Sequence, residues 1–290
     1  MTPGDHQKLR NARRGALRCS DDRTRNTDDA RGCASYSRAP DLACVRAASC
    51  SYALTRMEPD LPAVVLQEFS AGYEDRAVIH SISAAIQRKR TTALLGPGRS
   101  GKSTLLQAVA GVQGKNQWTS GGLWRLPCPM SVLAQKPLAA SRPLAQLLPR
   151  RRGDGGHPAA FIQHFWRQVA PTVASELAAR VDRPLGELPP PLRRLAEFTA
   201  AASGSAPLLL LDEPATGTDD RGRQWIRDKL VSMRGQRTIV LVTHNLRFAH
   251  AVSHDAIFLL DGEVVEAGIT EQMFTRPLRT RTRNLIKYGS

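Results

Sequence analysis

The chain is poor in aromatic residues and contains no long apolar run. Only 5% of its 290 residues are Phe, Trp or Tyr, so we expect a core made mainly of Leu, Val, Ile and Ala. No stretch approaches the roughly 18 consecutive apolar residues that a membrane-spanning helix needs. An apolar segment of the secretory type is also missing near the N-terminus. These absences predict a cytosolic protein without a membrane-spanning segment of its own.

Cysteine pairs of the metal-binding kind are missing as well. Four of the five cysteines precede residue 51, namely Cys19, Cys33, Cys44 and Cys50. None belongs to a C-x₂-C pair, and no histidine lies nearby at zinc-finger spacing. We therefore expect no zinc module and, in a cytosolic chain, no disulfide.

Residues 1–56 differ in composition from the rest of the chain. They have little periodicity, few large apolar residues and more basic than acidic side chains. This predicts a disordered basic extension followed by one domain over residues 57–290. Two interpretations stay open. Met57 is the true start of the protein, or the extension is a basic tail that touches a membrane or nucleic acid.

The most informative stretch is a glycine-rich loop between a short apolar run (93–95) and an apolar helical pattern (105–109). It matches G-x-x-x-x-G-K-[ST], and the residues expected to bind a nucleotide are Gly96, Pro97, Gly98, Arg99, Ser100, Gly101, Lys102, Ser103 and Thr104. Glycines let successive N–H groups point at phosphate oxygens, and a helix N-terminus favours an anion. We expect Lys102 to reach the β- and γ-phosphates and Ser103 to ligate Mg²⁺.

A second candidate site follows the apolar run 208–211, which is typical of a strand buried on both faces of a parallel sheet. The run ends in Asp212, Glu213 and Pro214. An acid at the carboxyl end of a buried strand beside the phosphate-loop strand can hold Mg²⁺, and we assign this role to Asp212. Glu213 would face the γ-phosphate and polarise an attacking water.

Two further polar residues follow predicted strands. Gln135 ends the strand expected at 130–133, and His244 ends the strand expected at 238–242. A neutral amide in that place can contact Mg²⁺ or the attacking water. His244 would lie beside the γ-phosphate, so both residues are candidates for catalysis.

The remaining pattern predicts an α/β fold with a parallel sheet. We expect an apolar strand at 63–66, a turn at 71–72, a strand pair within 77–86 and an irregular stretch at 112–128. Helices are expected at 102–109, 161–169, 173–179, 192–202 and 219–233. A hairpin at 256–266 precedes a basic helical tail from residue 270.

Taken together, these motifs resemble the nucleotide-binding subunits of ABC transporters over residues 63–275. The resemblance implies a P-loop NTPase fold with a mixed central sheet, an antiparallel β subdomain and a small, shortened helical subdomain. It implies ATP and Mg²⁺ as ligands, with Tyr73 stacked on adenine. It assigns metal contacts to Ser103, Gln135 and Asp212, and catalytic roles to Lys102, Gln135, Glu213 and His244. Asp219, after Thr216-Gly217-Thr218, matches the aspartate of the family's D-loop.

Four further segments, which are less specific than the nucleotide-binding motifs, resemble the sequences of ATPases that drive phosphate import. They are AQKP (134–137), VTHNLRFA (242–249), GEVVEAG (262–268) and MFTRP (273–277). The resemblance implies an importer subunit on the inner face of the cell membrane, with separate permease subunits and a second, identical or intact ATPase subunit as partners. The alternative is a non-transport regulatory protein with weak ATPase activity. A nucleic-acid partner is not expected despite the net charge of +15, because that charge lies in separate basic runs.

One segment departs from the family pattern. Residues 188–192 read Leu-Pro-Pro-Pro-Leu where the family has LSGGQ. That signature uses a serine hydroxyl and glycine N–H groups to bind the γ-phosphate held by the other subunit. Proline has no N–H to donate. We therefore expect this chain to bind Mg·ATP on its own face without completing the site of a partner. A homodimer would have two impaired sites, and a heterodimer with an intact subunit would have one competent site.

Overall fold

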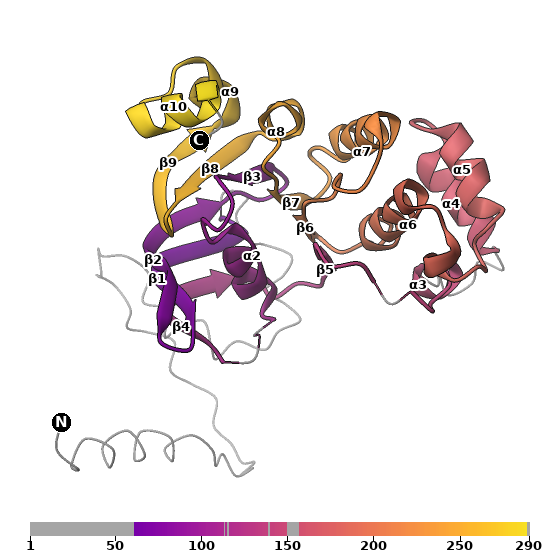
Figure 1. Ribbon diagram of the computed structural model, residues 1–290, viewed down its shortest axis with the longest axis horizontal. Coiled ribbons are helices and arrows are strands. Elements are labelled where there is room, and N and C mark those ends of the chain that lie inside the picture. The colour runs from indigo at the N-terminus through magenta and orange to yellow at the C-terminus, as the bar shows by residue number, and fades with distance from the viewer. Residues whose placement is uncertain (1–60, 113, 115, 139, 150–156, 289–290) are drawn as a thin grey trace, which may run out of the picture. The chain divides into compact units, whose positions relative to one another are not determined.

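The computed structural model describes residues 61–288, except 113, 115, 139 and 150–156. The predictions for residues 1–56 and the four early cysteines lie outside this range. Within the described residues, no helix combines the length and apolarity needed to cross a membrane. Two sheets and the helices packed on them build the domain (Figure 1).

The larger sheet has six strands in the order β5-β6-β7-β3-β8-β9. All neighbouring pairs are parallel except β8 and β9, which form an antiparallel hairpin. Its strands are β3 (Thr91–Leu95), β5 (Met130–Leu133), β6 (Leu208–Asp212), β7 (Thr238–Val242), β8 (Asp255–Leu260) and β9 (Glu263–Ile269). The predicted mixed, mainly parallel sheet is confirmed. The strand that ends in Asp212, β6, was expected beside β3, but β7 lies between these two strands.

The smaller sheet is antiparallel, with the order β2-β1-β4. Its strands are β1 (Val64–Tyr73), β2 (Arg76–Ile86) and β4 (Gln117–Arg125). The first helix after the phosphate loop, α2 (Lys102–Ala110), packs against strands of both sheets. This arrangement is the antiparallel β subdomain that the sequence predicted.

The central strands of the large sheet are buried on both faces. Leu208 and Leu210 pack in a core shared with α2 and the small sheet. Leu209 and Leu211 pack in a second core with the helices of the opposite face. These include α6 (Pro190–Ala202), α7 (Asp220–Ser232) and α8 (Leu246–Val252). Because every residue of β6 and β7 is buried, the carboxyl ends of these strands are fixed by packing on both sides.

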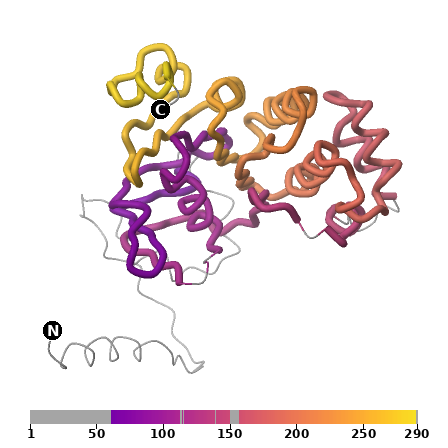
Figure 2. The backbone as a smooth tube through the Cα atoms, in the orientation of Figure 1, coloured from indigo at the N-terminus to yellow at the C-terminus, as the bar shows by residue number. Residues whose placement is uncertain are grey.

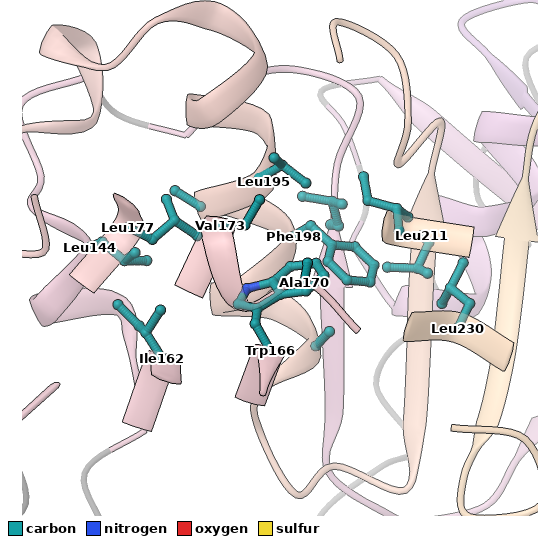
Figure 3. Packing of buried hydrophobic residues seen from close by; sticks show 14 of the residues in the cluster. Leu144, Ile162, Trp166, Ala170, Val173, Leu177, Leu195, Phe198, Leu211 and Leu230 are labelled. Carbon is teal, nitrogen blue, oxygen red and sulfur yellow. The ribbon is translucent and has the colours of Figure 1, made fainter. Parts of the chain in front are cut away.

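A group of short helices lies between β5 and α6 in the sequence. Figure 2 shows the course of the backbone through this group. It comprises α3 (Leu144–Leu147), α4 (Pro158–Trp166), α5 (Pro171–Ala178) and the 3₁₀ helix Leu185–Glu187. Trp166 lies at its centre, near Phe198 of α6 (Figure 3). The indole Nε1 donates a hydrogen bond of 2.9 Å to Thr199 Oγ1. This core ties the helical group to α6, and through α6 to the large sheet.

The C-terminal part begins with α9 (Thr270–Thr275) and α10 (Thr280–Tyr288). Met273 and Leu285 pack against Leu95 and Phe258 in a third, smaller core. The basic residues of α10 face outward, because its buried residues are Thr282 and Leu285. The predicted helical, basic tail is confirmed.

Three expectations for the small sheet were wrong. β1 continues through Ala71 and Gly72, where we expected a turn, and the chain reverses only at Glu74 and Asp75. Gly72 serves close packing instead, because a Cβ atom there would lie 2.2 Å from the carbonyl oxygen of Arg76. The segment expected to be a strand pair is the single strand β2, which is irregular near Ser81 (φ 45°).

The stretch 112–128, which we expected to be irregular, contains β4. Every residue of β4 is exposed or half-buried, so the sequence shows no clear apolar alternation. Gly121 has a φ of 80°, and a Cβ atom there would lie 2.2 Å from the carbonyl oxygen of Glu68. Here glycine marks a close approach of two strands, at a register shift, and not a loop.

We predict that Trp166→Ala lowers the free energy of unfolding by about 3–5 kcal/mol, because it leaves a cavity in a fully buried core. Trp166 has no exposed surface. Urea unfolding followed by circular dichroism measures the change. Val231→Ala on the outer surface of α7, where the side chain is 38% exposed, is the control and should change stability by less than about 0.5 kcal/mol. Equal effects of the two substitutions would contradict this packing.

Candidate functional site

The predicted phosphate loop joins β3 to α2, as expected. Gly96 and Gly101 have φ angles of 146° and 94°. A Cβ atom on Gly96 would lie 2.0 Å from the carbonyl oxygen of Leu259, and one on Gly101 would lie 2.5 Å from Ile79 Cδ1. Only glycine fits both the backbone angles and the space at these two positions. A Cβ atom on Gly98 would meet no described atom within 4 Å, so packing does not require glycine at this position.

Lys102 opens α2 and turns back onto the loop. Its Nζ donates hydrogen bonds to the carbonyl oxygens of Gly96 (2.9 Å) and Pro97 (2.6 Å) and to Ser100 Oγ (3.1 Å). Burial lowers the pKa of the Lys102 ammonium, while the negative charges of Glu213 and Asp212 oppose that shift. The lysine is therefore a desolvated cation at the mouth of the loop, near two carboxylates.

A cleft of about 560 Å³ lies over the loop. It is lined by residues 99–104 of the loop and by Tyr73. The Tyr73 hydroxyl donates to Gln107 Oε1 (3.1 Å), which holds the ring near the first turn of α2. Arg76, His80 and Asp261 also line the cleft and were not anticipated from the sequence. They come from β2 and from the turn of the β8–β9 hairpin, which no local pattern connects with the phosphate loop.

Asp212 ends β6 and is 5% exposed. Its Oδ1 atom is buried and has no hydrogen-bond partner among the described residues. Burial raises the pKa of the Asp212 carboxyl, and a hydrogen bond from Ser103 and the charges of Arg194 and Lys102 partly offset this rise. A buried carboxylate oxygen without a partner, beside a serine hydroxyl, fits a hard cation such as Mg²⁺, which prefers oxygen ligands.

Glu213 follows in a left-handed backbone conformation (φ 48°), and its carboxylate is held by several donors. Oε1 accepts from the backbone N–H of His244 (2.9 Å) and contacts His244 Nδ1 at 2.7 Å. Oε2 accepts from the hydroxyls of Thr243 (3.2 Å) and Thr216 (3.3 Å). The carboxylate is 12% exposed and the histidine 71% exposed, so the solvent-facing side of this pair is the imidazole.

The other predicted residues divide between the site and its surroundings. Gln135 lies exposed beyond the end of β5, and its side chain makes no hydrogen bond within the described residues. The structure therefore brings Lys102, Asp212, Glu213 and His244 together, but leaves the Gln135 side chain apart. Asp219 caps α7, because its Oδ1 accepts from the N–H of Gly222 at 2.7 Å.

The three consecutive prolines begin a helix. Pro189 is the N-cap of α6, and Pro190 and Pro191 form the start of its first turn. Proline suits the first turn of a helix, since the N–H groups there have no partner within the helix. The backbone N–H of Arg193 donates to the carbonyl oxygen of Pro189 at 2.8 Å. Only the Leu192 N–H remains for an anion, so this helix end has lost most of its donors.

Comparison with known proteins gives the same fold and related sequences. No protein-family model matches the chain. A solved structure described as the ATP-binding subunit of an ABC transporter superposes with a TM-score of 0.58 at 17% identity, over 78% of this chain and 98% of the other. A bacterial Atm1-family ABC exporter with ATP bound gives a TM-score of 0.65 at 18% identity, over 79% of this chain and 42% of the other. The fold is that of an ABC-type ATP-binding domain.

The sequence relatives point the same way. The phosphate import ATP-binding protein PstB 2 of Natronomonas pharaonis is 27% identical over 237 residues, which are 75% of this chain and 84% of the relative. PstB 2 of Bacillus subtilis is 25% identical over 77% of this chain and 91% of the relative. PstB of Salinibacter ruber is 25% identical over 78% of this chain and 97% of the relative. The resemblance to ABC ATP-binding subunits, and to the phosphate-import proteins among them, is confirmed.

We predict that Asp212→Asn stabilises the ABC-type fold in the absence of nucleotide near neutral pH. A raised pKa means that the folded state binds the proton more tightly than the unfolded state, so ionisation of Asp212 costs stability. The gain should be largest above the raised pKa and should disappear below the ordinary value of 3.8. Thermal unfolding at several pH values measures it. Asp220→Asn, whose side chain is 95% exposed, is the control. Asp212→Asn being the less stable variant at neutral pH would contradict the burial argument.

Proposed function

We propose that this chain binds and hydrolyses Mg·ATP as the ATP-binding subunit of an ABC transporter. The observation that carries the proposal is the unpartnered, buried Oδ1 of Asp212 beside Ser103, next to the ammonium of Lys102. An isolated carboxylate in such a place costs stability, and the cost is offset when a cation binds. The relatives named as ATP-binding proteins support the same proposal.

The phosphate loop would hold the triphosphate. Its glycines let backbone N–H groups turn toward phosphate oxygens, and the N-terminus of α2 adds a favourable dipole. A phosphate oxygen would replace one of the loop oxygens that Lys102 Nζ now contacts. Tyr73, which lines the same cleft, would offer its ring to the adenine. Arg76 and His80 line this cleft too and would meet the nucleotide from β2.

Mg²⁺ would be held by Asp212 and Ser103, with Gln135 as a further oxygen donor. Bound there, the ion would neutralise charge that develops on the phosphates. The oxygen donors match the preference of Mg²⁺ for carboxylate, hydroxyl and water ligands. Gln135 would have to move inward, since it is exposed and its side chain makes no hydrogen bond within the described residues.

Glu213 would act on the attacking water. Within the described residues its carboxylate accepts two hydrogen bonds on each oxygen, so one of these donors would have to release it before it could take the water proton. His244 would hold Glu213 in place and shift toward the γ-phosphate when ATP binds. Thr243 and Thr216, whose hydroxyls also donate to the carboxylate, would fix its rotamer.

We further propose an importer role, with phosphate as the cargo. The support is that the sequence relatives are named as phosphate-import proteins, together with the four importer-like segments of the sequence. In this role the chain would lie at the inner face of the membrane, against separate permease subunits. Affinity purification from membranes tests it: recovery of a permease supports transport, whereas recovery of no membrane protein favours the regulatory alternative.

We predict that Glu213→Gln lowers the rate of ATP hydrolysis by about a hundredfold or more, because it removes the proton acceptor. ATP binding should persist in this variant. Lys102→Ala should weaken ATP binding itself, because it removes the cation that meets the phosphates. Phosphate-release kinetics and equilibrium binding of a fluorescent ATP analogue measure the two effects. Asp220→Asn, whose side chain is 95% exposed, should leave both unchanged.

The proline run supports a division of labour between two subunits. With Pro189, Pro190 and Pro191 at the start of α6, the chain has few donors to offer to an ATP molecule held by a partner. We propose that its own site is completed by a subunit with an intact signature. Slow hydrolysis in isolation would also agree with the regulatory alternative, so partner identity decides between the two.

We predict that the triple variant Pro189→Ser, Pro190→Gly, Pro191→Gly hydrolyses ATP faster than the original chain when each is purified alone. The substitutions restore N–H donors at the helix start, and with them a complete site between two copies. The rate should rise more than linearly with protein concentration, as expected for a dimer. If the original chain turns over several times per second alone, and Glu213→Gln abolishes this, the impaired-homodimer hypothesis is wrong.

A further inference from the structure

Arg194 of α6 is a buried cation whose guanidinium is fully used. Its side chain is 7% exposed. Nε donates to the carbonyl oxygen of Pro214 (3.2 Å), and Nη2 donates to those of Asp212 (3.0 Å) and Glu213 (2.9 Å). Nη1 donates to the carbonyl oxygen of Ala134 (3.2 Å) and to Glu197 Oε2 (3.0 Å). A guanidinium has five N–H donors, and each has an acceptor here.

Four of the five acceptors are backbone oxygens of two loops at the candidate site. Three belong to the consecutive residues 212–214, which include the carboxylates Asp212 and Glu213. The fourth is the residue directly before Gln135. These loops follow the adjacent parallel strands β5 and β6, so a single side chain joins the carboxyl ends of both.

Glu197 completes the arrangement and is 2% exposed. Oε2 accepts from Arg194, and Oε1 accepts from the backbone N–H of Leu138 at 3.1 Å. The carboxylate neutralises the buried guanidinium and also holds the far end of the loop that contains Gln135. Since a buried charge is costly without a partner, Arg194 depends on Glu197, whose Oε1 also accepts from Arg193 Nε at 3.4 Å.

We propose that Arg194 is a positioning residue for the hydrolysis assigned above, because it holds the 134–138 and 212–214 backbones in register. Glu213 has a strained, left-handed backbone, and the bond from Arg194 to its carbonyl oxygen helps to maintain it. Arg194 does not line the cleft, and it bonds the backbone carbonyl oxygens of Asp212 and Glu213 and not their carboxylates. It acts by fixing the loops from which Gln135, Asp212 and Glu213 project.

A consequence concerns α6 itself. The helix begins with the three prolines and carries Arg194 and Glu197 one turn later. The helix end that occupies the signature position is therefore joined to the loops that carry Gln135 and Glu213. A displacement of this helix end by a partner subunit would move both loops together.

The test compares Arg194→Lys with two other variants of the full chain. Lysine keeps the positive charge. Its three N–H donors lie on a single nitrogen, so they cannot reach all five acceptors that surround the planar guanidinium of Arg194. Glu197→Gln removes the charge partner and keeps the shape. Arg237→Lys is the matched control, because Arg237 is half-buried and donates to the carbonyl oxygen of Ala202, away from both loops.

Hydrogen exchange gives the first measurement and does not depend on ATP hydrolysis. In Arg194→Lys and Glu197→Gln, we expect faster exchange confined to peptides that contain the amides of Leu138, Glu213 and Thr216. These amides are bonded to Glu197 Oε1, Val242 O and Glu213 O in the original chain. Peptides of β7 and α7 should exchange as before. Exchange that is unchanged at the loops, or faster throughout the molecule, would overturn the proposal.

Steady-state hydrolysis gives the second measurement and rests on the proposed function. In Arg194→Lys we expect kcat to fall by about ten- to a hundredfold, with KM for ATP and the midpoint of thermal unfolding close to those of Arg237→Lys. Faster exchange at the loops with an unchanged kcat would overturn the role in hydrolysis. If the original chain alone is inactive, as its proline run allows, the same comparison is made in the background of the triple proline variant. If that variant does not hydrolyse ATP either, the proposed function fails, and the exchange measurement alone decides whether Arg194 holds the loops.

Discussion

The constraint on which the rest of the structure depends is the burial of charge at the carboxyl edge of the large sheet. Asp212, at the end of β6, and Lys102, at the start of α2 after β3, have little exposed surface. Burial shifts the pKa of each side chain toward its neutral form. Such a site is unfavourable for the empty fold and favourable for a ligand that brings both phosphate oxygens and a divalent cation. The doubly buried strands β6 and β7 hold this edge in place, since packing on both faces leaves their ends no freedom to relax.

The acidic half of this edge is built from two kinds of support. Side chains hold the Glu213 carboxylate directly, through Thr216, Thr243 and His244. Arg194 instead holds backbone oxygens, so that it acts on the loops and not on the reacting groups. The first kind of support sets the rotamer of one residue, whereas the second sets the relative place of two loops. Both are needed if charged groups are to stay in position without a ligand to organise them.

Much of this framework follows from local patterns. The glycines of the phosphate loop supply two positive φ angles that the loop needs. The apolar runs before Asp212 and Thr243 are typical of strands buried on both faces. The strands, the loop and the helix after it could therefore be predicted from the sequence. The small sheet was harder to predict, because β4 has few buried side chains and Gly72 and Gly121 serve strand contacts that are remote in sequence. Arg194 was missed for a similar reason. Its acceptors lie in segments around residues 134 and 212–214, and only the fold brings them to one guanidinium. An arginine and a glutamate three residues apart on a buried helix face were the one available signal.

The chain thus combines a well-formed site on its own face with a helix start that prolines have deprived of donors. This combination is the basis of our proposal that a second subunit with an intact signature completes the site. The most direct test of the central claim is calorimetric titration of the full chain with ATP, with Mg²⁺ and with EDTA in its place. The account predicts one ATP bound per chain in the presence of Mg²⁺, and clearly weaker binding without the ion. Absence of binding at an ATP concentration of about 1 mM, or an affinity indifferent to Mg²⁺, would contradict it.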